Sequence, residues 1–170
     1  LDLLGGPEQA RGVIYELCGG LASTPAQERR DGFHDVVDKV PGIEVIGGLD
    51  CDWKLSRAQD TFKTAPLDRI DLVYAHNDPM AYGAYQAAAD LGRAEEIFFI
   101  GIDALPDEGQ QWVRRGALTA TLLYPTPGET GLDMAVRILR GEDVPKRVTL
   151  PTLVFTRENV DEGGAPVAVD

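Results

Sequence analysis

Short apolar runs alternate with longer segments of helical periodicity along most of the chain. The apolar runs show no regular polar alternation, which is typical of strands buried on both faces of a sheet. They lie at residues 12–18, 43–46, 72–75, 97–102 and 118–124. The segments expected as helices lie between them, at residues 23–40, 52–62, 79–91 and 107–115. This alternation predicts an α/β fold with a Rossmann-like parallel sheet and helices on both faces.

The rhythm changes after Pro125. Thr126-Pro127-Gly128 interrupts the pattern, an amphipathic helix follows at residues 129–139, and a final extended segment follows at 148–155. These changes divide the chain into three expected parts. The parts are an α/β domain at residues 1–125, a crossing helix with a final strand segment at 126–160, and a loose tail at 161–170.

The stretch from Leu72 to Ala88 is the most informative part of the sequence, because polar residues cluster where a strand is expected to end. A buried strand is expected to end at Ala75, and the sequence His76-Asn77-Asp78-Pro79 then leads directly into an Ala-rich helix. Open α/β sheets place ligand contacts where a strand ends and feeds a helix. Asn77 and Asp78 are therefore placed to meet a small polar ligand, to cap the helix, or to do both.

Charge and composition narrow the range of expected partners. The chain has 170 residues and a net charge of −12, with 16 basic residues dispersed among 28 acidic ones. Phosphate backbones are bound by clustered Lys and Arg, so a nucleic-acid partner is not expected. The chain opens at Leu1 without a charged-then-apolar leader. Any secretion signal is therefore expected to have been removed or to lie outside the sequence.

The sequence offers no catalytic or metal-binding spacing. His34 and His76 are far apart, and the two cysteines, Cys18 and Cys51, do not form a metal framework. We find no nucleophile with a base at usable spacing and no Gly-x-Gly-x-x-Gly motif, so we expect neither a cofactor nor an enzyme. Both cysteines end strands expected to be neighbours, which leaves either one disulfide or two free thiols.

Several motifs follow in the order found in one known family. They are residues 25–33, 74–84, 100–106, 116–121 and 139–145. In this order the chain resembles the periplasmic sugar-binding proteins of the ribose and galactose type, which share a core with the lac repressor. The resemblance covers roughly residues 11–160, and Ile102 and Ala104 depart from the family's Gly-aromatic-Asp-Gly loop.

The resemblance implies two Rossmann-like lobes that are joined by three crossings and hold a sugar between them. This chain resembles the second lobe together with the helix at 129–139, which in the family returns to the first lobe. The first lobe has no counterpart before Leu1. We therefore expect either that the sequence is a piece cut from a longer protein or that another polypeptide supplies the first lobe.

The resemblance also assigns ligand-binding residues. Arg29 matches the family's sugar-binding arginine, Asn77 and Asp103 match its hydrogen-bonding Asn and Asp, and Trp53 matches its ring-stacking aromatic. Tyr124 falls at a hinge position where the family often has a polar side chain. Each has a structural alternative: a surface ion pair for Arg29, a helix cap for Asn77 and Asp103, core packing for Trp53 and hinge packing for Tyr124.

Two neighbouring residues are expected to serve the fold. Adjacent residues of a strand point to opposite faces, so His76 is expected to point away from Asn77 and into the core. Asp78 is expected to cap its helix.

The resulting prediction is a non-enzymatic monosaccharide receptor, hexose- or pentose-like in specificity, that serves an ABC-type sugar importer and its membrane permease. It would be periplasmic or extracellular, as a secreted protein or a lipoprotein. One alternative is the extracellular sensor domain of a membrane signalling protein, and another is the effector-binding core of a lac-repressor-like transcription factor. A nucleotide-dependent α/β enzyme would instead bind phosphate at Gly19-Gly20.

Overall fold

A single seven-stranded sheet organises the chain in the order β2-β1-β3-β4-β5-β6-β7. The computed structural model describes residues 1–6 and 9–167. The first five strands pair in parallel, and the last two are antiparallel to their neighbours. The strands are β1 (Gly12–Cys18), β2 (Ile43–Asp50), β3 (Leu72–Ala75), β4 (Phe98–Asp103), β5 (Ala120–Leu123), β6 (Leu153–Thr156) and β7 (Ala165–Pro166). The predicted Rossmann-like fold is confirmed.

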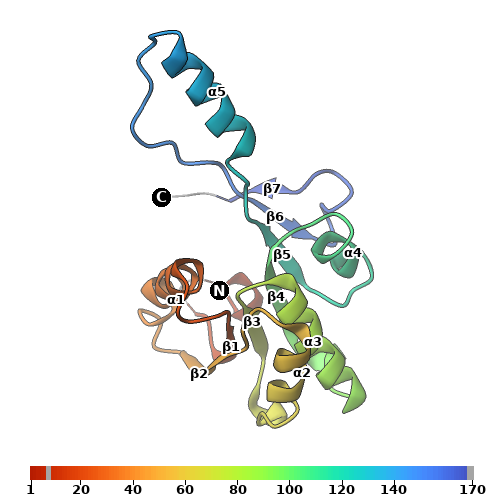
Figure 1. Cartoon of the computed structure of the whole chain (residues 1–170). Helices are drawn as coiled ribbons and strands as arrows, with labels where there is room; N and C mark the ends of the chain where they lie inside the picture. The colour runs from red at the N-terminus through yellow and green to blue at the C-terminus, as the bar shows by residue number, and fades with distance from the viewer. Residues whose placement is uncertain (7–8, 168–170) are drawn as a thin grey trace.

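Helices cover both faces of this sheet, as the sequence predicted. They are α1 (Thr24–Val37), α2 (Leu55–Phe62), α3 (Asp78–Asp90) and α4 (Gly109–Arg114), and a further helix, α5 (Gly128–Leu139), follows β5. Helix α1 lies on one face, and α2, α3 and α4 lie on the other (Figure 1). Within residues 1–6 and 9–167 no helix is both long and apolar enough to cross a membrane.

The alternation of side chains along each strand divides the interior into two clusters. The larger cluster joins strands to α2 and α3 through buried residues that include Leu17, Val73, Phe99, Phe62 and Met80. The smaller cluster lies under α1 and contains the buried residues Ile14, Val37 and Leu72. Because successive residues of a strand face opposite sides, Leu72 and Val73 belong to different clusters.

The segment after β5 leaves the sheet and returns to it. Helix α5 projects away from the rest of the chain (Figure 1), and none of its residues is buried. Strand β6 then pairs with β5, and β7 pairs with β6. The expectation of a loose tail at 161–170 is therefore wrong for residues 165–166, because their backbone joins the sheet. Residues 168–170 lie outside the described part of the chain.

Glu16, a charged residue of β1, links the sheet to α1 through ionic and hydrogen-bonding contacts. Its carboxylate is buried and lies 3.3 Å from His76 Nε2, 3.3 Å from His34 Nε2 and 3.7 Å from Arg30 Nη1. His76 Nδ1 accepts a hydrogen bond from Gly19 N–H at 3.2 Å, so the proton of a neutral ring sits on Nε2 and is donated to Glu16. His76 is fully buried, as predicted.

The same contacts shift two pKa values in opposite directions. Burial raises the pKa of Glu16, but hydrogen bonds from His76 and His34 and the nearby charge of Arg30 outweigh it, so this pKa lies below its ordinary value. Burial lowers the pKa of His34, but hydrogen bonds to Asp38 and Glu16 outweigh it and raise the net pKa. The charged forms of both residues are therefore favoured in the folded chain.

These shifts predict how stability depends on pH. The contribution of His34 is fully present below its ordinary pKa of 6.5 and is lost as pH rises through the raised value. The contribution of Glu16 is present above its ordinary pKa of 4.5 and is lost as pH falls through the lowered value. We expect Glu16→Gln to lower the pKa of His34 in an NMR titration. The same change should reduce the free energy of unfolding at neutral pH by about 1–3 kcal/mol.

Asp38→Asn is the matched control, because Asp38 is the exposed partner of the same ring. It should also lower the pKa of His34 but change the free energy of unfolding by only about 0.5 kcal/mol or less. A His34 pKa that stays unchanged in Glu16→Gln would contradict the network.

Candidate functional site

The five residues expected to bind ligand each lie at or after the end of a different strand of the parallel sheet. Arg29 lies in α1 after β1, and Trp53, Asn77 and Tyr124 follow β2, β3 and β5. Asp103 is the last residue of β4. The carboxyl ends of parallel strands meet at one edge, and the strand order reverses between β1 and β3, where such sheets bind ligands. All five residues therefore belong to this edge.

Arg29 is the centre of the group. Its Nη2 atom lies 3.3 Å from Asp103 Oδ1, and its Nη1 atom donates to the carbonyl oxygen of His76. The guanidinium carbon lies 5.3 Å from the centre of the Trp53 ring and 4.8 Å from that of Tyr124. Both distances are within the range of cation–π attraction. Arg29 therefore brings Trp53, Asp103 and Tyr124 of the expected group together.

Trp53 lies on the backbone of Gly19. A Cβ atom at Gly19 would come within 2.5 Å of the indole ring, so only glycine leaves room for it. The carbonyl oxygen of Trp53 accepts a hydrogen bond from Asn77 Nδ2 at 3.2 Å. The sequence marked Gly19-Gly20 only as a loop or a phosphate cradle. In the structure the Gly19 N–H already donates to His76, which removes support for a phosphate-binding loop.

Asn77 has two structural contacts of its own. It is the N-cap of α3, where its Oδ1 accepts from Met80 N–H at 3.0 Å while its Nδ2 reaches Trp53. The cap is the structural alternative to ligand binding at this position, yet one Nδ2 proton and one Oδ1 lone pair remain for a ligand. The expectation that Asp78 caps the helix is wrong, because its carboxylate turns away to bind Ala104 N–H and the Thr121 hydroxyl.

Backbone strain coincides with the site. Among the residues that the structure describes, four non-glycine residues have a positive φ: Asp52, Trp53, Asp103 and Ala104. They form two pairs, in the two loops that carry Trp53 and Asp103. A non-glycine residue in this region costs about 1–3 kcal/mol, and such strain gathers at functional sites. Strain in these loops therefore supports a functional role for this edge.

The carboxyl group of Asp103 is partly exposed beside the guanidinium. Burial raises its pKa, and this effect outweighs the lowering by Arg29, while Glu108 raises it further. The edge therefore presents a guanidinium with several donors, a carboxylate acceptor and two aromatic faces on one surface. A small hollow of about 250 Å³ adjoins it, lined by residues that include Arg29 and Tyr124.

The two cysteines are free in the structure. Cys18 Sγ lies 3.4 Å from Arg30 of α1, whereas Cys51 Sγ lies 3.9 Å from Thr61 of α2, so the thiols face opposite sides of the sheet. The disulfide left open by the sequence is not formed. Burial also raises the pKa of Cys18 to about 12, which suppresses its thiolate.

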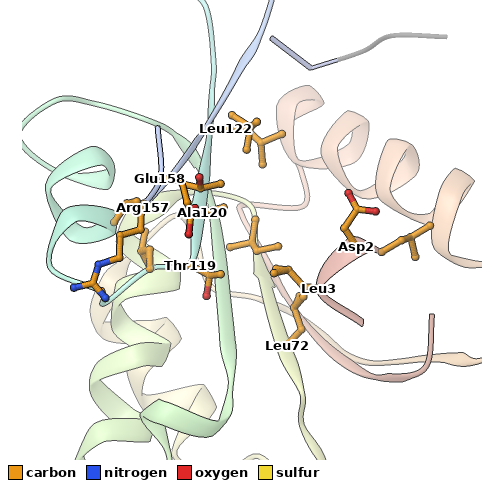
Figure 2. A pocket seen from close by; sticks show the side chains of 15 residues that line it. Asp2, Leu3, Leu72, Thr119, Ala120, Leu122, Arg157 and Glu158 are labelled. Atoms are coloured by element: carbon orange, nitrogen blue, oxygen red, sulfur yellow. The ribbon is translucent and has the colours of Figure 1, made fainter. Parts of the chain in front are cut away.

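Another hollow lies on the face of the sheet that α1 covers only in part. It has a volume of about 570 Å³ (Figure 2), and its lining is largely apolar, with Leu3, Leu72, Ala120 and Leu122 among the labelled side chains. None of the five expected residues lines it. We therefore place the candidate site at the carboxyl edge, where the polar groups converge.

Comparison with known proteins shows which family the chain belongs to. Residues 1–143 match the profile of the periplasmic binding protein domain. A xylitol-binding protein of Mycolicibacterium smegmatis is 33% identical over 165 residues, which are 94% of this chain and 46% of that protein. The chain spans about half the length of the curated relatives it matches.

Two solved structures share the fold. The fructose-binding periplasmic domain of a hybrid two-component system is 41% identical, with a TM-score of 0.83, over 90% of this chain and 52% of that chain. An ABC transporter solute-binding protein from Bacillus halodurans with bound myo-inositol is 28% identical, with a TM-score of 0.79, over 90% and 54%. The chain belongs to the periplasmic binding protein family.

Proposed function

We propose that this chain forms one wall of a non-enzymatic binding site for a neutral monosaccharide or polyol. The observation that carries the proposal is the convergence of Arg29, Trp53, Asp103 and Tyr124 at one edge of the sheet. The relatives named above for xylitol, fructose and myo-inositol support it, because these molecules are uncharged and carry many hydroxyl groups.

Each group fits a hydroxyl-rich ligand. A guanidinium donates in a fixed fork that suits neighbouring hydroxyls, and a carboxylate accepts strong charge-assisted hydrogen bonds from hydroxyl protons. The Trp53 ring offers a face on which the C–H side of a sugar ring can lie. Arg29 and Asp103 already balance each other's charge, so an uncharged ligand leaves neither charge unpaired.

A second lobe would complete the site. Relatives are about twice as long as this chain, which supports a two-lobed protein that closes around the ligand by hinge bending. In this proposal residues 1–125 form the ligand-gripping lobe, and residues 126–160 form the crossing helix and final strand. Closure would present the loaded protein to a membrane permease in the periplasm or outside the cell.

A sensor role is the second candidate. The relative that is 41% identical is, by its name, the periplasmic domain of a hybrid two-component system, so a closely similar domain serves signalling. The same site would then report ligand closure to a kinase instead of delivering the ligand to a permease. The two roles differ outside this chain, and a kinase domain encoded in the same gene would favour the sensor.

Tryptophan fluorescence tests the position of the site. The chain has two tryptophans, Trp53 at the site and Trp112 on α4, where it stacks on Tyr82 with ring centres 4.4 Å apart. Titration with fructose, xylitol or myo-inositol should change the emission of the unaltered chain and of Trp112→Phe, but not that of Trp53→Phe. The reverse result would move the ligand to the α3–α4 surface.

Alanine substitutions test the polar contacts. Asp103→Ala and Asn77→Ala should each weaken sugar binding by about 1–3 kcal/mol, because a buried hydrogen-bonding partner is left unsatisfied. Chemical-shift titration by NMR measures this even where the affinity is only millimolar. Asp107→Ala, an exposed carboxylate on the same loop, is the matched control and should bind as the unaltered chain does. Unchanged affinity in both site variants would refute the proposed contacts.

A further inference from the structure

Asp78 is a buried carboxylate that forms no ion pair with a basic side chain in the described part of the chain, residues 1–6 and 9–167. It is the first residue of α3 and is 1% exposed. Its Oδ1 accepts from the Thr121 hydroxyl at 2.6 Å, and its Oδ2 accepts from Ala104 N–H at 2.8 Å. The N-terminus of a thirteen-residue helix also favours a negative charge at this position. The carboxylate is therefore held by neutral donors and a helix dipole.

Two glycines pack directly against the Asp78 carboxylate. A Cβ atom at Gly101 would collide with Asp78 Oδ1, and one at Gly109 would collide with Oδ2. Strand β4, helix α4 and strand β5 thus all close around one carboxylate. Burial raises the pKa of Asp78 to about 6, with smaller contributions from the carboxylates of Asp103 and Glu108, while Thr121 and Ala104 lower it. An ionised group in this place costs stability, so its role is not simple stabilisation.

The bond to Ala104 acts on the strained part of the site. Asp103 and Ala104 are consecutive and have φ values of 129° and 54°. Ala104 is buried, and its carbonyl oxygen also accepts from Gln110 Nε2 at 2.8 Å. If the Ala104 N–H lost its partner, the chain could relax towards ordinary φ values, and the Asp103 carboxylate would turn away from Arg29.

We propose that Asp78 is a positioning residue, whose carboxylate holds the Asp103–Ala104 backbone in the conformation that aims Asp103 at Arg29 and at the ligand. The statement about the ligand rests on the proposed function. The statement about the backbone does not, and it is measured without ligand.

The test compares four variants of the chain. Asp78→Ala removes both contacts, and Thr121→Val removes the support of the carboxylate. Asp78→Asn keeps the geometry, because the amide oxygen can accept from Ala104 N–H while its NH2 group donates to Thr121. Thr119→Val is the matched control, because the Thr119 hydroxyl, just before β5, accepts from Phe99 N–H at 3.0 Å, at the other end of β5 from the site.

The first measurement is amide hydrogen exchange at Ala104 without ligand. Exchange should quicken by about tenfold or more in Asp78→Ala, less in Thr121→Val, and hardly at all in Asp78→Asn or Thr119→Val. Backbone coupling constants at Asp103 and Ala104 should report a change of φ in Asp78→Ala. Unchanged exchange and couplings in Asp78→Ala would overturn the proposal. If Asp78→Ala does not fold, Ala104 amide exchange is compared between Thr121→Val and Thr119→Val. Equal exchange rates in these two variants would then overturn the proposal.

The second measurement is affinity for fructose, xylitol and myo-inositol. The affinity should fall about tenfold in Asp78→Ala and recover in Asp78→Asn, although the Asp78 side chain is only 1% exposed. An equal loss in Thr119→Val would show a general loss of stability and would also overturn the proposal. If the unaltered chain binds none of the three, the proposed function fails, while the exchange result still decides the backbone role.

Discussion

Parallel strands that pair in register end at a common edge, and the candidate site depends on this constraint. Cys18 of β1 lies opposite Asp50 of β2, and Leu17 lies opposite Ala75 of β3. Further along the strand order, and at the same edge, Asp103 of β4 lies opposite Leu123 of β5. Side chains that are far apart in sequence are thereby brought to one surface without any long loop.

Two buried carboxylates hold this edge in different ways. Glu16 is surrounded by His76, His34 and Arg30, and its pKa is lowered because the surrounding groups outweigh burial. Asp78 accepts from two neutral donors, Ala104 N–H and the Thr121 hydroxyl, at a helix N-terminus, and burial raises its pKa to about 6. The first fixes α1, and with it the backbone that carries Arg29. The second, as proposed here, fixes the loop that carries Asp103.

The two strained loops each rest on a buried support. The loop with Asp52 and Trp53 is held where the indole covers Gly19 and where Asn77 donates to the Trp53 carbonyl. The loop with Asp103 is held by the bond from Ala104 to Asp78. Rigid supports of this kind keep side chains in position before a ligand arrives, which lowers the entropy cost of binding.

The sequence by itself determined the α/β fold, the position of the strands β1 to β5, and the five residues that meet at their carboxyl ends. It could do so because the alternation of strands and helices is a local signal, and the motifs appear in a known order. Whether those residues grip a ligand stays a prediction. The short strand β7 was missed, since two residues carry no periodicity of their own.

Only the tertiary structure decided which contacts each polar side chain makes. Asp78 reaches residues 26 and 43 positions away, and that reach depends on how β4 and β5 pair and where α3 docks. Tertiary packing likewise places the Trp53 ring on Gly19 and directs the thiols of Cys18 and Cys51 to opposite sides of the sheet. A short sequence window records which side chains can form hydrogen bonds, but the packing of distant elements chooses their partners.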